Sequence, residues 1–127
     1  ARRNAELAAR IGINLVTFHA GFIPHDSGDP EWTKLINRLR DLVDVFHGCG
    51  VRVGLETGQE TADSLIAALD ALDRPTAGIN FDPANMILYG MGDPADALER
   101  EAGDQRVKDV TAAAALVRAH AGWVEYA

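Results

Sequence analysis

Two patterns of apolar residues alternate along the chain. Short runs rich in β-branched and other apolar residues predict strands at residues 13–18, 51–55 and 77–81. Longer segments repeat apolar residues every three or four positions, which predicts helices at residues 32–46 and 61–72. Strands that alternate with helices at this spacing are typical of βα units built around a parallel sheet.

Local signals predict further helices. Asp93 followed by Pro94 is a typical helix start and predicts a helix over residues 94–102. Alanine and leucine favour a short helix at residues 5–10, and a last helix is expected at roughly residues 104–120. Either Asp26 or Asp29 is available to cap the helix at residues 32–46.

Two segments are predicted to be loops. Residues 22–30, FIPHDSGDP, are rich in Pro, Gly, Asp and Ser. Such a loop is longer than most connections and is therefore a candidate for function. Residues 83–94, PANMILYGMGDP, are predicted to form a second loop with at most one helical turn.

Each predicted strand is followed directly by a polar residue: His19, Glu56 or Asp82. The carboxyl ends of parallel strands meet at one edge of a sheet, where α/β folds assemble ligand sites. Neighbouring strands lie about 5 Å apart, so Glu56 and Asp82 are expected to reach one divalent cation. We expect the Glu56 strand to be covered on both faces, which favours a site or an ionic partner for its carboxylate. Each of the three residues also has a purely structural interpretation. Glu56 would then cap a helix or form an ion pair, Asp82 would bond to the backbone of its own turn, and His19 would be hydrogen-bonded at a strand end.

Three more residues are candidates for binding a substrate. Asn85 and Gln59 carry neutral side chains of the kind that orient sugar hydroxyls, although Asn is also common in turns and caps. His25 lies in the predicted loop at residues 22–30, from which it would close over a ligand.

Composition narrows the possible partners. The 127 residues include 12 Lys and Arg against 19 Asp and Glu, a net charge of -7 that argues against a nucleic-acid partner. No apolar run approaches the ~20 residues of a membrane span, so no membrane partner is expected. The single cysteine, Cys49, excludes an internal disulfide and favours a reducing, cytoplasmic location. Neither a P-loop nor a GxGxxG motif occurs, so nucleotide binding has no support.

Three motifs, TFHAGFIPHD, GLETGQET and GINFDPANMILYGMGDP, resemble the sugar phosphate isomerase/epimerase family with the xylose isomerase-like TIM barrel, and they follow the family's order. The resemblance implies a divalent metal (Mn, Mg, Co or Zn) held by two Glu, one Asp and one His. It implies that Glu56 is the first glutamate and Asp82 the aspartate. The segment ALEREAGDQR is similar to the family's last strand and implies Glu99 as the second glutamate.

The chain departs from the family pattern near its C-terminus. The family's histidine-bearing strand and a further helix have no counterpart between GMGDPAD and ALEREAG. A rival alignment matches RVKDV to that strand and places Arg106 at the ligand position. We therefore expect residues 1–127 to form a single partial α/β TIM-barrel domain of about three parallel strands with flanking helices, not a closed barrel. Uncovered edges and an apolar barrel interior make such a unit unstable alone, prone to associate as a homo-oligomer, or part of a longer protein.

The resemblance implies an isomerase or epimerase of carbohydrate metabolism that acts on a small sugar or sugar phosphate. A proton would move next to a carbonyl through an enediolate, with Glu56 and Glu99 as catalytic acid and base. Four residues are expected to contact the substrate: His19, His25, Gln59 and Asn85. One alternative is a truncated, inactive fragment that at most binds a divalent metal. A less favoured alternative is an endonuclease IV-like DNA repair enzyme, which would need more histidines and a basic face.

Overall fold

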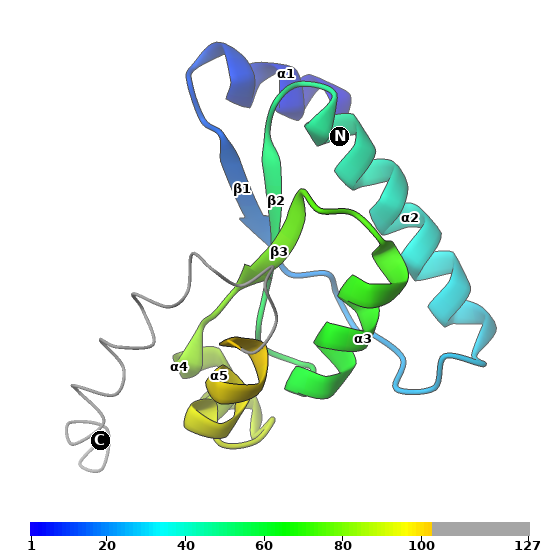
Figure 1. The fold of residues 1–127 in the computed structure, drawn as a ribbon, viewed down its shortest axis with the longest axis vertical. Coiled ribbons are helices and arrows are strands. Elements are labelled where there is room, and N and C mark those ends of the chain that lie inside the picture. The colour runs from blue at the N-terminus through cyan, green and yellow to red at the C-terminus, as the bar shows by residue number, and fades with distance from the viewer. Residues whose placement is uncertain (103–127) are drawn as a thin grey trace.

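The computed structural model describes residues 1–102, which form three strands and five helices, alternating as far as α4 (Figure 1). In chain order the elements are α1 (Arg2–Arg10), β1 (Leu15–Phe18), α2 (Pro30–His47), β2 (Arg52–Glu56), α3 (Ala62–Leu72), β3 (Ala77–Asn80), α4 (Pro83–Tyr89) and α5 (Pro94–Ala102). The predicted helix at residues 104–120 and the rival ligand position Arg106 lie outside the described residues.

The strands form a parallel sheet in the order β1-β2-β3. Phe18 pairs with Leu55, and Leu55 pairs with Ile79. One step further along, Glu56 at the end of β2 is in register with Asn80 at the end of β3. This open parallel sheet with flanking helices confirms the predicted architecture, and its register brings all three carboxyl ends to the same edge.

One face of the sheet packs against helices α2 and α3, which run alongside it in Figure 1. Leu55 is fully buried and Ile79 is 8% exposed, because both contact the apolar stripe of these helices. That stripe includes Leu39 and Val43 of α2 and Leu69 of α3. Burial of this kind contributes about 1.5–3 kcal/mol for each large side chain.

Residues that alternate with this core point to the opposite face of the sheet, because successive side chains of a strand alternate in direction. Thr17 pairs with Gly54, and Gly54 pairs with Gly78, so two of the three residues in that row have no side chain. In β1 both Leu15 and Thr17 are exposed. The prediction of a buried strand at residues 13–18 is therefore wrong. In β2, by contrast, Val53, Gly54 and Leu55 are all buried, as expected for the strand that carries Glu56.

Helix α4 corrects a second prediction. Residues 83–89 form a helix of seven residues rather than part of a loop. Asp82 caps its first turn, Pro83 occupies the first helical position, and Gly90 ends it with a left-handed backbone at φ 66°. These are ordinary start and stop signals, but the sequence prediction gave the glycines and prolines of this segment the weight of loop residues.

The remaining boundaries agree closely with prediction. Asp29, one of the two predicted caps, accepts a hydrogen bond from the Glu31 backbone N–H at 2.8 Å. The Thr61 hydroxyl caps α3 by accepting from the Ser64 N–H. Among the described helices none is long and apolar enough to cross a membrane.

Candidate active site at the carboxyl edge of the sheet

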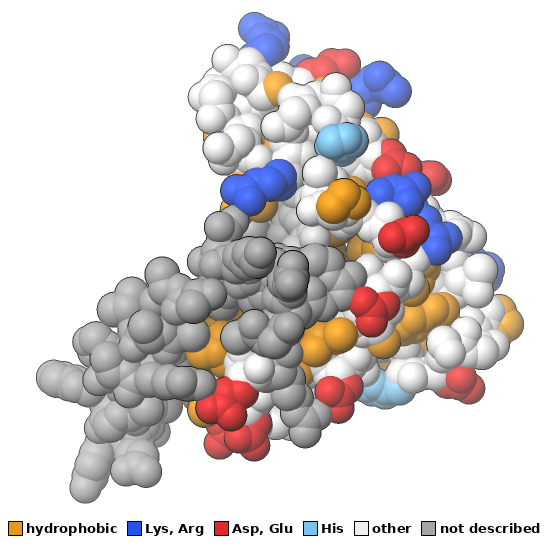
Figure 2. Space-filling model, in the orientation of Figure 1, with side chains coloured by type: hydrophobic (Ala, Val, Ile, Leu, Met, Phe, Trp, Pro, Cys, Tyr) orange, Lys and Arg blue, Asp and Glu red, His pale blue; other side chains and the backbone are white. Residues whose placement is uncertain are grey.

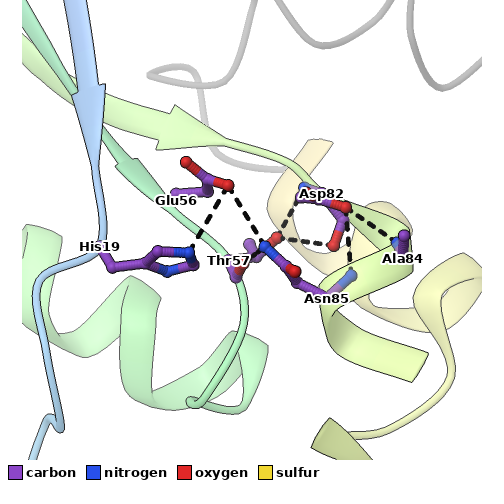
Figure 3. A network of polar contacts seen from close by, with 6 residues as sticks. All are labelled: His19, Glu56, Thr57, Asp82, Ala84 and Asn85. Carbon is purple, nitrogen blue, oxygen red and sulfur yellow. Dashed lines mark hydrogen bonds and ion pairs between the residues drawn. The ribbon is translucent and has the colours of Figure 1, made fainter. Parts of the chain in front are cut away.

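Polar side chains from all three strand ends lie at one edge of the sheet (Figure 3). His19 follows β1, Glu56 is the last residue of β2, and Asp82 follows β3 by two positions. The His19 Nε2 atom lies 3.6 Å from the Glu56 Oε1 atom. Glu56 is partly shielded, with 24% of its side chain exposed, whereas His19 is 46% exposed. The predicted convergence of strand ends is therefore present, with Glu56 at its centre.

Asn85 completes this group from the first turns of α4. Its side-chain amide donates to Glu56 Oε1 at 3.2 Å and to the backbone carbonyl of Thr57 at 3.4 Å. Figure 3 shows Asn85 and His19 approaching the same carboxylate oxygen from different sides. The bond from Asn85 thus orients the Glu56 carboxylate, and His19 lies beside the same oxygen.

Thr57 connects the ends of β2 and β3. Its hydroxyl accepts from the Asp82 backbone N–H at 2.7 Å and donates to the Asp82 backbone carbonyl at 3.2 Å. The Thr57 backbone N–H donates to the Asn80 carbonyl at 3.0 Å. The residue is only 2% exposed, so these bonds form away from bulk water. Sequence reasoning did not single out Thr57, because a threonine after a strand end has many possible roles.

The Asp82 carboxylate serves the helix that follows it. Its Oδ1 atom accepts from the backbone N–H groups of Ala84 at 2.9 Å and Asn85 at 3.1 Å. The structural interpretation of Asp82 thus applies to Oδ1, which is engaged as an N-cap. The same bonds set where α4 starts, and they thereby place Asn85 beside the strand end that carries Glu56.

Gly58 gives the His19 ring its place. A Cβ atom on Gly58 would lie 3.1 Å from His19 Cε1 and 3.4 Å from His19 Nδ1, closer than ordinary contact distances. The imidazole therefore lies directly against the backbone at Gly58. A side chain at this position would displace the ring. The GLETG segment thus supplies both the Glu56 carboxylate and the glycine against which the His19 ring lies.

Glu60 is a second buried residue that sequence reasoning missed. It is only 4% exposed, and its Oε2 atom has no hydrogen-bond partner among the described residues. Burial raises the pKa of the Glu60 carboxyl. Hydrogen bonds from the backbone N–H groups of Glu60 and Gln59 oppose this shift, and His19 opposes it to a smaller extent. The burial of Glu60 depends on tertiary packing that no local pattern reports.

The other predicted site residues lie elsewhere. The His25 Nδ1 atom is 3.0 Å from the Ser64 hydroxyl, so His25 ties its loop to the start of α3. Gln59 is exposed. Glu99 lies on the exposed side of helix α5, consistent with the helix predicted for its segment. The structure does not bring Glu99 together with Glu56 and Asp82 in a group that could hold a metal.

The donor set for a metal ion is incomplete within residues 1–102. No group of three or more His, Cys, Asp or Glu side chains in this part of the chain is placed to bind one ion. Glu56 and Asp82 supply two carboxylates, and one oxygen of Asp82 already caps α4. Divalent cations take at least four ligands in proteins, so the described residues do not by themselves fit a complete metal centre.

Comparison with known proteins places these observations in a family. Residues 1–122 match the model of the xylose isomerase-like TIM barrel. The chain is 42% identical to the xylose isomerase domain protein from Planctomyces limnophilus, with a TM-score of 0.76 over 80% of this chain and 36% of that one. A comparison with curated protein sequences found no significant match.

Two further solved structures share the fold at lower identity. One is the probable 3-DHS dehydratase AsbF involved in petrobactin synthesis from Bacillus anthracis, with 23% identity and a TM-score of 0.66 over 80% of this chain and 38% of that one. The other is a D-tagatose 3-epimerase-like protein, with 23% identity and a TM-score of 0.61 over 79% of this chain and 40% of that one. The chain thus spans well under half the length of the structures it matches.

The match over residues 1–122 confirms the resemblance inferred from the three motifs and explains the open sheet as part of a larger barrel. The chain belongs to the xylose isomerase-like TIM barrel family.

Proposed function

We propose that this chain carries part of the active site of a sugar or sugar phosphate isomerase or epimerase that moves a proton next to a carbonyl. The observation that carries the proposal is the oriented Glu56 carboxylate, held at the carboxyl edge of the sheet by Asn85 and flanked by His19. In α/β barrels this edge is where catalytic groups gather. Glu56 is the acid/base group in this proposal.

The proposed chemistry is a proton transfer through an enediolate. Glu56 takes a proton from the carbon beside the carbonyl, and the electron pair of that C–H bond moves toward the carbonyl oxygen. His19 is placed to donate a hydrogen bond to an oxygen of a bound sugar, whereas Asn85 can accept from a sugar hydroxyl through its side-chain carbonyl, because both N–H groups of its amide already have partners. Return of the proton to the opposite face of the same carbon gives an epimer, and return to the neighbouring carbon gives an isomer. By resemblance, Glu99 is the second acid or base in this proposal.

A divalent metal (Mn, Mg, Co or Zn) would polarise the carbonyl in such a site. Since residues 1–102 provide an incomplete ligand set, no step above depends on the metal. Metal binding by Glu56 and Asp82 remains a proposal with its own test. Mn²⁺ affinity is compared among the wild type, Glu56→Gln and Asp82→Asn, because Asn keeps the helix cap while it removes the charge. Weaker binding in both variants supports the proposal, and equal affinities in all three contradict it.

Deuterium exchange tests the proposed reaction. The chain is incubated in deuterated water with D-tagatose or D-fructose 6-phosphate, with and without added Mn²⁺, and deuterium in the ketose is measured by mass spectrometry. We expect Glu56→Gln to reduce incorporation by about 10²–10⁴-fold, the usual contribution of a general base. Glu6→Gln is the control, because Glu6 is an exposed residue of α1. Equal incorporation by Glu56→Gln and the wild type would rule out Glu56 as the base.

The same assay separates the alternatives. An absence of exchange in the wild type under all conditions favours the inactive fragment. A DNA repair activity like that of endonuclease IV has less support, because Figure 2 shows acidic side chains at the lower end of the visible face and basic side chains interspersed with acidic ones elsewhere. DNA binding requires a continuous positive surface.

A further inference from the structure

We propose that Thr57 is a positioning residue of this site, which acts by holding the backbone of Asp82 so that Asn85 meets Glu56. The inference rests on the proposed role of Glu56 as the acid/base group. Thr57 is adjacent to Glu56 in the chain, yet its side chain contacts the other strand end. Its effect on Glu56 therefore runs through β3 and α4.

The contacts form a closed ring, visible in Figure 3. The Thr57 hydroxyl binds the backbone N–H and carbonyl of Asp82, and the Asp82 carboxylate accepts from the Asn85 backbone N–H. The Asn85 side chain then donates to Glu56 Oε1, and Glu56 is covalently joined to Thr57. We call these four residues the Thr57 ring. Each bond of the ring limits the freedom of the next residue.

The position of Thr57 explains why a hydroxyl is needed there. The ladder between β2 and β3 ends with the bond from the Thr57 N–H to the Asn80 carbonyl. Beyond that point the strands no longer pair. The Asp82 carbonyl accepts from the Met86 N–H at 3.3 Å as α4 begins, whereas the Asp82 N–H lies outside the helix and needs a partner of its own. A hydroxyl both donates and accepts, so Thr57 satisfies this N–H and adds a second donor to the carbonyl with one oxygen atom. A valine has the same shape but leaves the Asp82 N–H without this acceptor, next to a side chain that is 2% exposed.

Loss of the Thr57 hydroxyl is expected to affect Glu56 through the position of Asn85, because the residues that contact Glu56 stay the same. Asn85 contacts Glu56 only if α4 starts at the right place, and that start is set by Asp82. Thr57→Val removes no atom of Glu56, Asn85 or His19. It is nevertheless expected to loosen the amide that orients the carboxylate, and a displacement of about 1 Å at a reacting group can reduce turnover about 10²-fold.

The experiment uses the full chain and two readouts. The first is the NMR spectrum, in which amide hydrogen exchange at Asp82 and the side-chain amide signals of Asn85 report on the Thr57 ring directly. The second is the deuterium incorporation assay with D-tagatose and D-fructose 6-phosphate. Thr57→Val is compared with Thr57→Ser, which keeps the hydroxyl, and with Thr33→Val, which makes the same atomic change on the exposed side of α2.

We expect Thr57→Val to speed hydrogen exchange at Asp82 by about tenfold and to shift the Asn85 side-chain signals. Its kcat should fall by about tenfold or more, with KM changed by less than about twofold. Thr57→Ser should restore both readouts, and Thr33→Val should leave both as in the wild type.

The readouts separate the two proposals. If the wild type shows no deuterium incorporation, the proposed function fails, and the Thr57 ring is then judged by the NMR signals alone. Unchanged Asn85 signals in Thr57→Val would overturn the role of Thr57, whatever the activity. A purely structural role is indicated if Thr57→Val lowers only the free energy of unfolding and leaves kcat unchanged, and this result would also overturn the proposal.

Discussion

The two faces of the sheet differ in what their residues do. On the face packed against α2 and α3, the central row consists of Phe18, Leu55 and Ile79, which join one apolar core. On the opposite face the row below the site consists of Thr17, Gly54 and Gly78. The first face holds the fold together. The second is formed by small side chains in this row and carries Glu56 at its carboxyl end.

This difference shows how one strand can serve stability and chemistry together. Leu55 and Glu56 are neighbours in β2, yet Leu55 is fully buried and 24% of the Glu56 side chain is exposed. Successive side chains of a strand point to opposite faces of the sheet, so these two neighbours point in opposite directions. Substitutions on the helix-packed face are therefore expected to change stability, whereas substitutions at the site are expected to change local geometry.

The largest effect is expected for Leu55→Ala. Loss of this fully buried side chain should lower the free energy of unfolding by about 2–5 kcal/mol. Asn80→Ala, one residue beyond Ile79 on the opposite face, should cost less than about 1 kcal/mol. Urea denaturation followed by circular dichroism measures both values. Equal losses of stability in the two variants would mean that the two faces of the sheet contribute equally to packing, and would contradict the difference between them.

Glu60→Gln should have the next largest effect, and it should stabilise the protein. Burial raises the pKa of the Glu60 carboxyl above its unfolded value, so this group favours the folded state below the unfolded pKa and loses that contribution as the pH rises through the folded pKa. A neutral amide avoids this loss. The gain at pH 7 is expected to be on the order of 1 kcal/mol and to shrink toward pH 4.

Denaturation of Glu60→Gln and the wild type across this pH range measures the gain. Glu6→Gln, at an exposed position of α1, is the control for a change of net charge. A lower stability of Glu60→Gln at pH 7 would show that the carboxylate has a favourable partner.

Gly58→Ala should have a small effect on stability, under about 1 kcal/mol, but a clear local effect. The added methyl group would lie 3.1 Å from the His19 ring, and the ring, on a half-exposed side chain, can turn away. NMR signals of the His19 imidazole should shift while the core methyl signals remain in place. Unchanged imidazole signals would show that the backbone, not the ring, moves to accommodate the methyl group.

The smallest effect is expected at the surface pair between Asp44 and Arg74. Arg74 donates to both carboxylate oxygens of Asp44, at 2.6 and 3.0 Å, and these bonds lower the pKa of the Asp44 carboxyl. The stabilising contribution is therefore present above the unfolded pKa and is lost as the pH falls through the folded pKa. Asp44→Asn should show a shallower loss of stability in acid than the wild type. Identical acid profiles would mean that the exposed pair contributes nothing measurable.

Much of the fold follows from local signals in the sequence. The periodicities locate β2, β3, α2 and α3 to within a few residues, because these elements carry the apolar stripe of the core. The prediction was wrong for α4, whose capping signals Asp82, Pro83 and Gly90 are present but were read as loop residues. It was also wrong for the burial of β1. The burial of a strand depends on the neighbouring units of the barrel, which a local pattern does not report.

The candidate site was predictable only in outline. Convergence of His19, Glu56 and Asp82 follows from parallel strands, and Asn85 was recognised as a polar candidate near them. Thr57 and Glu60 were not identified, because their importance depends on contacts across the sheet edge and on burial. Short-range sequence patterns report neither contacts between distant residues nor the burial of a side chain.

The Thr57 ring lies within residues 56–85, which run from the last residue of β2 through α3 and β3 into α4, whereas His19 follows β1. The four residues therefore come from one contiguous piece of chain that spans two consecutive βα units. Recombination that exchanges a single βα unit would separate Glu56 and Thr57 from Asp82 and Asn85, so only a piece that carries both units would transmit the arrangement intact, while His19 would vary with the host.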